Sequence, residues 1–180
     1  MRAVLDACVL YPPVLRALLL GAAAVGLYTP LWSDRILEEW ARATKKLGPN
    51  AEVQARVEVA LTKSAYPLAL LRPAYGLEQR LHLPDENDIH VLAVAIAGSA
   101  EVIITWNVSD FPRQILANEG LERRDPDGFL WQLYSENPTK LKNILDAVLA
   151  KSIQMAGNNI SLKSMLKKAK LPRLAKATTA

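Results

Sequence analysis

The chain has 180 residues with a formal net charge of +4, and 51% of its residues are hydrophobic against 22% charged. This balance excludes an intrinsically disordered chain, and the length suits one globular domain with a sizeable core. The single cysteine, Cys8, excludes an intramolecular disulfide framework and a cysteine-based zinc site, and it agrees with a reducing cytoplasm.

The N-terminal segment indicates neither secretion nor membrane insertion. Asp6 stands where a signal peptide would have its apolar core. The longest apolar stretch, residues 14–30, is interrupted by Arg16 and by two glycines, so it is too short and too broken for a membrane span. We therefore expect a cytoplasmic protein with no membrane contact, in which this stretch forms a buried helix.

The chain opens with the pattern of a strand, a turn and a helix, which is typical of an α/β sheet. Residues 2–6 form a short β-type run that ends in an acid. The proline pair Pro12-Pro13 marks the turn, because proline suits the first turn of a helix. The helix itself is expected over residues 14–25.

Two further helices follow. The first begins near Ser33 or Asp34, either of which can cap the first free amides, and Gly48 ends it. The second spans about residues 52–63. The next segment, residues 66–83, contains prolines and is harder to interpret, although a short strand is expected at residues 68–71.

The middle of the chain predicts one more helix and the remaining strands. Asp85 resembles an N-cap before a helix that runs to Ala97 and ends at Gly98. Residues 101–105 form a β-branched run that suits a central parallel strand. Residues 121–124 are expected to form an edge strand.

The C-terminal part predicts helices over residues 126–170, with breaks near Pro138 and Asn158. Residues 126–180 contain nine Lys and Arg residues but three Asp and Glu residues, whereas residues 1–125 contain 13 and 15. A mildly acidic body with a basic tail is compatible with nucleic-acid contact. The alternative is a solvated helix face with a frayed terminus.

Several acids occupy positions that a parallel α/β sheet would bring together. Asp6 ends the first strand, and Asn107 and Asp110 follow the β-branched strand, so they converge if these strands are neighbours. Asp85 and Asp88, three residues apart, can lie on one helix face. Clustered carboxylates repel one another unless a cation compensates, and oxygen ligands suit Mg²⁺ or Mn²⁺.

Each residue also has a structural explanation. Asp6 could be a turn residue, Asp88 could interact with the helix dipole, and Asp110 could cap a turn. Asp85 is better explained as a cap than as a ligand. Among neighbouring residues, Cys8 is expected to pack as a small hydrophobe, His90 to be a packing or surface histidine, and Glu38 to be a solvated surface acid.

In combination these segments resemble the PIN domain and, within it, the VapC-like toxins of bacterial toxin–antitoxin pairs. The segments that carry the resemblance are Val4–Leu10, Trp32–Arg42, Leu83–Ala95 and Ile103–Phe111. They follow the family's order over about residues 2–130, and four motifs in order are more specific than any one of them.

The resemblance implies a three-layer α/β/α sandwich with a central parallel sheet over residues 1–130, followed by a helical, basic extension over residues 131–180. It also implies a Mg²⁺- or Mn²⁺-dependent site. The matching metal ligands are Asp6, Glu39 and Asp88. Asn107 stands where many members have Asp, which leaves the fourth site position open between Asn107 and Asp110.

Two supporting residues complete the implied site. Thr105 would orient the loop that carries the fourth position, and Asp85 would assist from the helix start. As implied by the resemblance, the activity is hydrolysis of RNA phosphodiester bonds, with tRNA or ribosomal RNA as substrate. The implied partners are a cognate antitoxin and, because family members are often dimers, a second copy of the chain.

Two other functions fit parts of the pattern. A phosphotransferase could use Asp6 as its nucleophile, but the second acid expected two positions later is Cys8. A non-catalytic RNA- or partner-binding module with an impaired site is favoured slightly by Asn107 and by the basic tail. Retention of RNA binding in EDTA would distinguish such a module from a metal-dependent nuclease.

Overall fold

The computed structural model describes residues 1–178, and the backbone divides into two compact units. The first, here called the sheet unit, comprises residues 1–11 and 29–124. The second, the helical unit, comprises residues 12–28 and the chain from Asp125 onward. The last two positions of the helical extension expected over residues 131–180, positions 179 and 180, lie outside the described residues.

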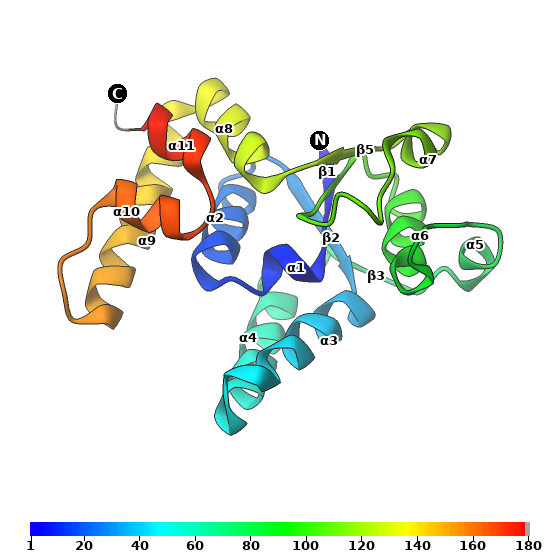
Figure 1. The fold of residues 1–180 in the computed structure, drawn as a ribbon, viewed down its shortest axis with the longest axis horizontal. Helices are drawn as coiled ribbons and strands as arrows, with labels where there is room; N and C mark the ends of the chain where they lie inside the picture. The colour runs from blue at the N-terminus through cyan, green and yellow to red at the C-terminus, as the bar shows by residue number, and fades with distance from the viewer. Residues whose placement is uncertain (179–180) are drawn as a thin grey trace. The chain divides into compact units, whose positions relative to one another are not determined.

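The sheet unit is built on five parallel strands in the order β3-β2-β1-β4-β5 (Figure 1). The strands are β1 Arg2–Leu5, β2 Thr29–Ser33, β3 Leu70–Leu71, β4 Val102–Ile104 and β5 Glu122–Arg124. β1 and β4 are neighbours, with Leu5 opposite Ile104. Apart from the exposed Arg2, both are apolar runs whose side chains are buried, as in parallel strands covered on both faces.

β2 is the strand that the sequence did not predict. It runs between β1 and β3, yet it contains Pro30, which lies opposite Ala3. Proline cannot donate a hydrogen bond and therefore argues against an internal strand. Leu31 and Trp32 are fully buried, and Trp32 donates its backbone N–H to Ala69. Burial of these side chains outweighs the local preference against a strand.

Helices flank this sheet. Their bounds, with η for 3-10 turns, are α1 Ala7–Leu10, α3 Asp34–Ala43, η1 Thr44–Leu47, α4 Pro49–Ala65, α5 Tyr75–Glu78, η2 Glu86–Asp88, α6 Ile89–Ala97 and α7 Arg113–Asn118. Ser33 caps α3, since its hydroxyl accepts a hydrogen bond from the Ile36 N–H at 3.3 Å. The caps predicted at Ser33 and Asp85 and the stop at Gly98 are confirmed. Helix α3 ends earlier than predicted, at Ala43, and Gly48 ends the 3-10 turn η1 that follows it.

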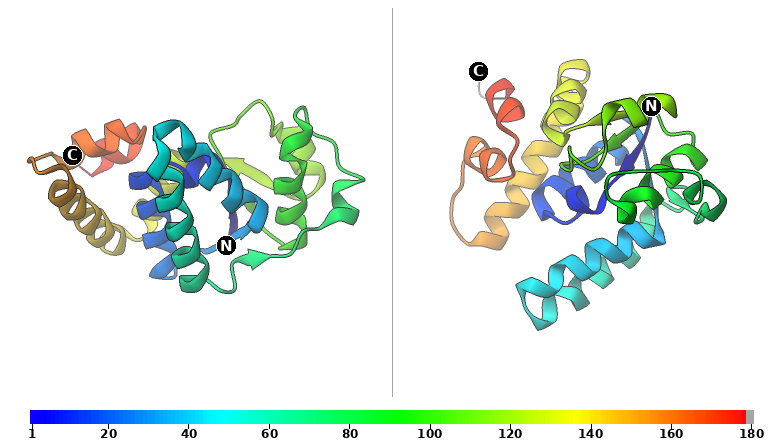
Figure 2. Two further views of the ribbon diagram at one scale, coloured as in Figure 1. Left: turned by 90° about the horizontal axis from the view of Figure 1, so that it is seen from below. Right: turned by 45° about the vertical axis from the view of Figure 1, so that its right-hand side comes forward.

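The strand order places these helices on two faces. The chain steps from β1 to β2 to β3 in one direction, and then from β3 to β4 to β5 in the other. Because parallel crossovers are right-handed, the α3–α4 pair and α6 cover opposite faces of the sheet. Figure 2 shows these two helical groups apart from one another. The predicted α/β/α sandwich is therefore confirmed.

The helical unit contains α2 Pro13–Ala24, α8 Pro126–Glu136, α9 Pro138–Ala156, α10 Leu162–Lys168 and α11 Pro172–Ala177. The buried helix and the breaks near Pro138 and Asn158 are confirmed. Helix α2 packs against α9 so closely that a Cβ on Gly21 would lie 2.7 Å from Ile144. α11 lies within the helical extension that the resemblance implied, but beyond the helices expected from the residue pattern over 126–170, because its basic, alanine-rich sequence is also typical of a frayed end.

Within residues 1–178, no helix is both long enough and apolar enough to cross a bilayer. The leucine-rich α2 instead buries Leu15, Leu18 and Leu19 completely.

Candidate active site

The site starts where β1 and β4 end side by side. Asp6 directly follows β1 and is 6% exposed, and Thr105 directly follows β4 and is 1% exposed. The Thr105 hydroxyl donates to Asp6 Oδ2 at 2.6 Å and accepts from the Asn107 backbone N–H at 2.9 Å. Thr105 thereby holds both Asp6 and the start of the loop after β4.

Cys8 belongs to the same network, contrary to its expected role as a small hydrophobe. Its Sγ donates to Asp6 Oδ2 at 3.1 Å and accepts from the Trp106 backbone N–H at 3.3 Å. Burial, followed by the charge of Asp6, raises the pKa of the thiol to about 12. Cys8 therefore stays protonated and acts as a donor to Asp6. Its position two residues after Asp6, on the first helical turn, was the sequence signal for this contact.

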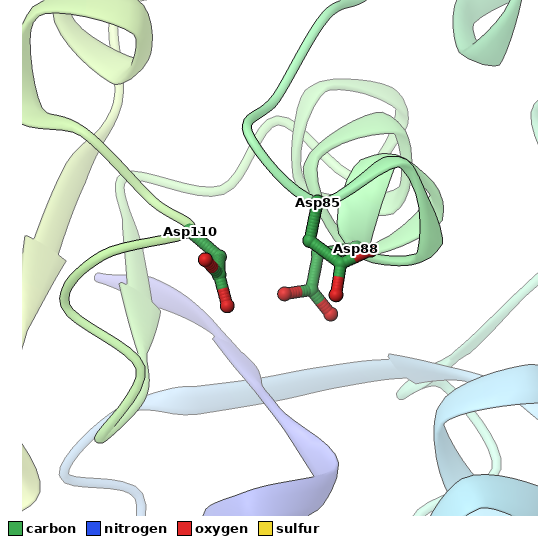
Figure 3. Close-up of side chains that lie close together, drawn as sticks. All are labelled: Asp85, Asp88 and Asp110. Carbon is green, nitrogen blue, oxygen red and sulfur yellow. The ribbon is translucent and has the colours of Figure 1, made fainter.

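Three aspartates meet next to this network. Oxygen atoms of Asp85, Asp88 and Asp110 all lie within 4.8 Å of one another. Figure 3 shows Asp85 and Asp88 at the start of the α6 segment and Asp110 on the loop after β4, with their carboxylates turned toward a shared space. Asp85 is also the expected cap, because its Oδ1 accepts from the Asn87 N–H at 2.9 Å.

The pKa of Asp88 reflects its burial and the charges of the neighbouring acids. Burial, and then the charges of Asp6, Asp85, Asp110 and Glu39, raise its pKa from 3.8 to about 6. These four carboxylates thus lie within electrostatic reach of Asp88. Within residues 1–178, no lysine or arginine forms an ion pair with any of the four aspartates.

This unbalanced set of oxygen donors fits a divalent cation. Mg²⁺ and Mn²⁺ take carboxylate ligands, and such an ion would offset the repulsion that raises the pKa of Asp88. Asp85, Asp88 and Asp110 are placed to supply ligands together. Asp6 stands beside them with one oxygen, Oδ2, already committed to Thr105 and Cys8.

Asn107 lies within the site but contacts an acid. Its side-chain amide donates to Asp88 Oδ2 at 3.0 Å, and its Oδ1 accepts from the Ser109 hydroxyl at 3.3 Å. Asp110, rather than Asn107, contributes a carboxylate to the grouping with Asp85. The two candidates for the fourth position therefore have different places in the site. Asn107 orients the Asp88 carboxylate, and Asp110 faces it.

Glu39 lies at the edge of the site on α3. Its Oε1 accepts from Arg35 Nε at 3.3 Å and lies 3.0 Å from Nε2 of His90. The latter distance suits an ion pair if the imidazole is protonated, but the ring N–H direction does not suit a hydrogen bond, and neither nitrogen of this buried histidine makes one within residues 1–178. Glu39 is thus partly neutralised, unlike the aspartates.

The neighbouring acid, Glu38, is engaged elsewhere. It pairs with Arg56 at 2.7 Å and with Arg42 at 2.7 Å, and these contacts lower its pKa to about 2. A helix turns about 100° per residue, so Glu38 and Glu39 point in different directions. Glu39 is the acid on this helix whose charge acts on Asp88.

A parallel α/β/α sandwich with a metal-competent acidic cluster beyond its strand ends is the arrangement expected of a nuclease-like fold. The PIN-domain family profile matches residues 2–109, and the chain belongs to this family. PIN domains are generally nucleases that bind divalent metals. The chain matches no curated protein and no solved structure significantly.

Proposed function

We propose that the protein is a Mg²⁺- or Mn²⁺-dependent endoribonuclease of the VapC-like type, acting in the cytoplasm as the toxin of a toxin–antitoxin pair. The observation that carries the proposal is the group of uncompensated carboxylates around Asp88 on a PIN fold. Structured RNA such as tRNA or ribosomal RNA would be the substrate, as the likeness to those toxins implies.

The proposed site divides into groups that hold the ion and groups that orient them. Asp85, Asp88 and Asp110 would hold the cation together, with Asp6 and Glu39 contributing from β1 and α3. When bound, such an ion activates water and stabilises the leaving oxygen of a phosphodiester.

The orienting groups act on the acids directly. Thr105 and Cys8 donate to the same oxygen of Asp6, which fixes the rotation of its carboxylate. Asn107 holds one oxygen of Asp88 in place. Pre-oriented acids need little rearrangement when a cation and the substrate phosphate arrive.

The test is cleavage of labelled RNA with Mg²⁺ or Mn²⁺ and in EDTA. We expect the wild-type protein to cut only with metal, and Asp6→Asn and Asp88→Asn to lose the activity. Glu39→Gln and Glu38→Gln form a matched pair of adjacent residues on one helix, and only Glu39→Gln should reduce cleavage. Metal-independent cleavage, or full activity in Asp6→Asn, would contradict the proposal.

A non-catalytic RNA- or partner-binding module is the second candidate. Asn107 favours it, since an amide at that position supplies no charge. That module would bind RNA equally well with and without EDTA and would cut none under any metal condition.

The toxin role needs a protein partner, and α4 offers a surface for one. Val53, Val57 and Leu61, spaced by four residues, are exposed by 55–65% on one side of this helix. We assign this side to the antitoxin. Co-purification with the product of a short upstream reading frame, lost in Val57→Glu, would support the assignment, whereas a chain that forms only homodimers through Val57 would contradict it.

A further inference from the structure

The last two helices of the helical unit carry a concentration of positive charge. Here the α10–α11 basic surface denotes the exposed side chains of Lys163, Lys167, Lys168, Lys170, Arg173 and Lys176. No acid follows Asp146 in the sequence. Counting side chains, the helical unit carries a net charge of +6 and the sheet unit −2.

This surface is part of a packed structure. Leu166, Leu171 and Leu174 are fully buried beneath it. The carboxylate of Asp127, on α8 and 4% exposed, accepts from the backbone N–H groups of Arg173 at 2.9 Å and Leu174 at 3.0 Å. Asp127 therefore caps the start of α11 from another helix. The positive charges are held on fixed elements.

The connection between the two helices carries a lysine at a position where glycine is usual. Lys170 adopts a left-handed conformation, with φ of 60°, and the Leu171 N–H bonds back to the Leu166 carbonyl. Glycine is the usual residue at such a helix end, because it adopts this conformation without strain. Here the position instead carries a charged side chain.

The charges are not balanced within the protein. Within residues 1–178, Arg173 alone among the six approaches an acid, at 4.0 Å from Asp125. Lys163 and Lys167 lie on one side of α10 because four residues separate them, and like charges at this spacing repel. A polyanion would relieve this repulsion.

We propose that the α10–α11 basic surface binds the sugar–phosphate backbone of RNA, independently of the metal site. Arginine and lysine contacts to phosphates supply the sequence-independent part of RNA affinity. The sheet unit, being acidic, repels a polyanion and needs such an attractive surface on the same chain. That the bound RNA is also the substrate rests on the proposed function.

RNA fits this surface better than an anionic membrane does. A helix that lies in a bilayer interface needs large apolar side chains beside its basic ones. Between residues 161 and 178, none of the large apolar side chains is exposed. The surface therefore offers charge without the apolar groups that insertion requires.

The experiment measures binding of a fluorescein-labelled single-stranded RNA to the full-length protein in EDTA, so that cleavage plays no part. The test variant is Lys163→Gln/Lys167→Gln/Lys170→Gln. The matched control, Lys140→Gln/Lys142→Gln/Lys151→Gln, removes three exposed charges from α9 of the same unit. Circular dichroism verifies that each variant folds. A second variant, Lys163→Arg/Lys167→Arg/Lys170→Arg, changes the same three side chains but keeps their positive charge.

We expect the test variant to bind of the order of 100-fold more weakly at about 0.1 M salt, and its slope of log Kd against log salt to fall by roughly 2, as three lost phosphate contacts require. The control and the Lys→Arg triple should stay close to wild type. Equal losses in the test and control variants, or unchanged RNA binding in the test variant, would overturn the proposal. Binding to phosphatidylglycerol vesicles, with no binding to RNA, would overturn it in favour of a membrane.

The result of this binding experiment can be distinguished from success or failure of the proposed nuclease function. Asp88→Asn should lose cleavage and retain RNA affinity in EDTA. If wild-type protein never cuts RNA but the test triple still weakens binding, the basic surface stands and the proposed nuclease fails. If wild-type protein cuts RNA but the test triple binds normally, the reverse holds.

Discussion

Thr105 and Asp6 are 99 positions apart in the chain, yet the threonine hydroxyl lies 2.6 Å from the aspartate Oδ2. The contact exists because β1 and β4 are neighbours with Leu5 opposite Ile104, so the residue after each strand emerges at the same edge. Both side chains are buried. A hydrogen bond between them therefore links the two strands and sets the orientation of an acid in the proposed site.

Thr105→Val should destabilise the protein by about 2 kcal/mol, since it removes one of the two donors to Asp6 Oδ2 and leaves the Asn107 N–H without its partner. Thr105→Ser keeps the hydroxyl and should recover most of the loss. Chemical denaturation without metal measures the effect. Equal stability of Thr105→Val and wild type would show that the bond contributes nothing.

The thiol of Cys8 should react slowly with iodoacetamide in the folded protein, because its pKa is raised to about 12 and the thiolate is the reactive form. Asp6→Asn removes the second-largest cause of that shift, the aspartate charge. The pH profile of alkylation should therefore move to lower pH in this variant. A profile that does not move would mean that burial alone controls the thiol.

Asp88 predicts a pH-dependent stability in the metal-free protein. Its folded pKa of about 6 exceeds the unfolded value of 3.8, so the folded state holds the proton more tightly. Stability should fall as pH rises from about 4 to about 6. At neutral pH, Asp88→Asn should stabilise the metal-free protein by about 1–2 kcal/mol, allowing for solvent screening.

Thermal melts across this pH range measure the effect, and added Mg²⁺ or Mn²⁺ provides a second test. The cation should raise the Tm of wild type more than that of Asp88→Asn, because the variant has lost one of its proposed ligands. Equal metal-induced shifts in the two proteins would argue against Asp88 as a ligand.

Asp127→Ala should loosen α11, because it removes the carboxylate that accepts from the Arg173 and Leu174 amides. We expect a loss of about 2 kcal/mol, the range of a lost cap and buried amides without partners. Amide hydrogen exchange reports it directly, with faster exchange at Leu174. The nearby Asp125→Ala serves as control and should spare these two amides, because Asp125 caps α8 instead.

Gly98→Ala should destabilise the sheet unit by about 1–3 kcal/mol through overpacking. A Cβ at this position would lie 2.5 Å from a methyl carbon of Leu71 and 2.9 Å from one of Leu31. Gly76→Ala is the matched control, since nothing lies within 4 Å of its Cβ and its φ is not in the left-handed region. Thermal denaturation should show a change in the first variant and little in the second.

Gly98 illustrates what sequence reasoning captures and what it omits. A glycine after an apolar helix correctly predicted the helix end. A glycine at a helix end usually adopts a left-handed backbone. Gly98 instead has an ordinary φ of −81°, and the positive φ of 48° belongs to Ser99. The glycine is needed because α6 packs tightly on the sheet, and such tertiary contacts leave no local pattern in the chain.

The site shows the same division. The positions of Asp6 and Asp110 after strands, and the spacing of Asp85 and Asp88, predicted that these acids would lie close together. The hydrogen bond from Cys8 to Asp6 depends on the direction of a side chain at the first turn of α1, which hydropathy does not reveal. β2 was not predicted for a related reason. Pro30 lowers the local propensity for a strand, whereas burial of the side chains that follow it stabilises one.

The helical unit draws its chain from two separate stretches, residues 12–28 and the part from Asp125 onward. Its α2 is therefore made early in synthesis, and its partner α9 follows more than a hundred residues later. No single cleavage of the polypeptide can release the sheet unit intact from the rest. During translation, α2 cannot make its contacts with α9 until residues 138–156 have been synthesised.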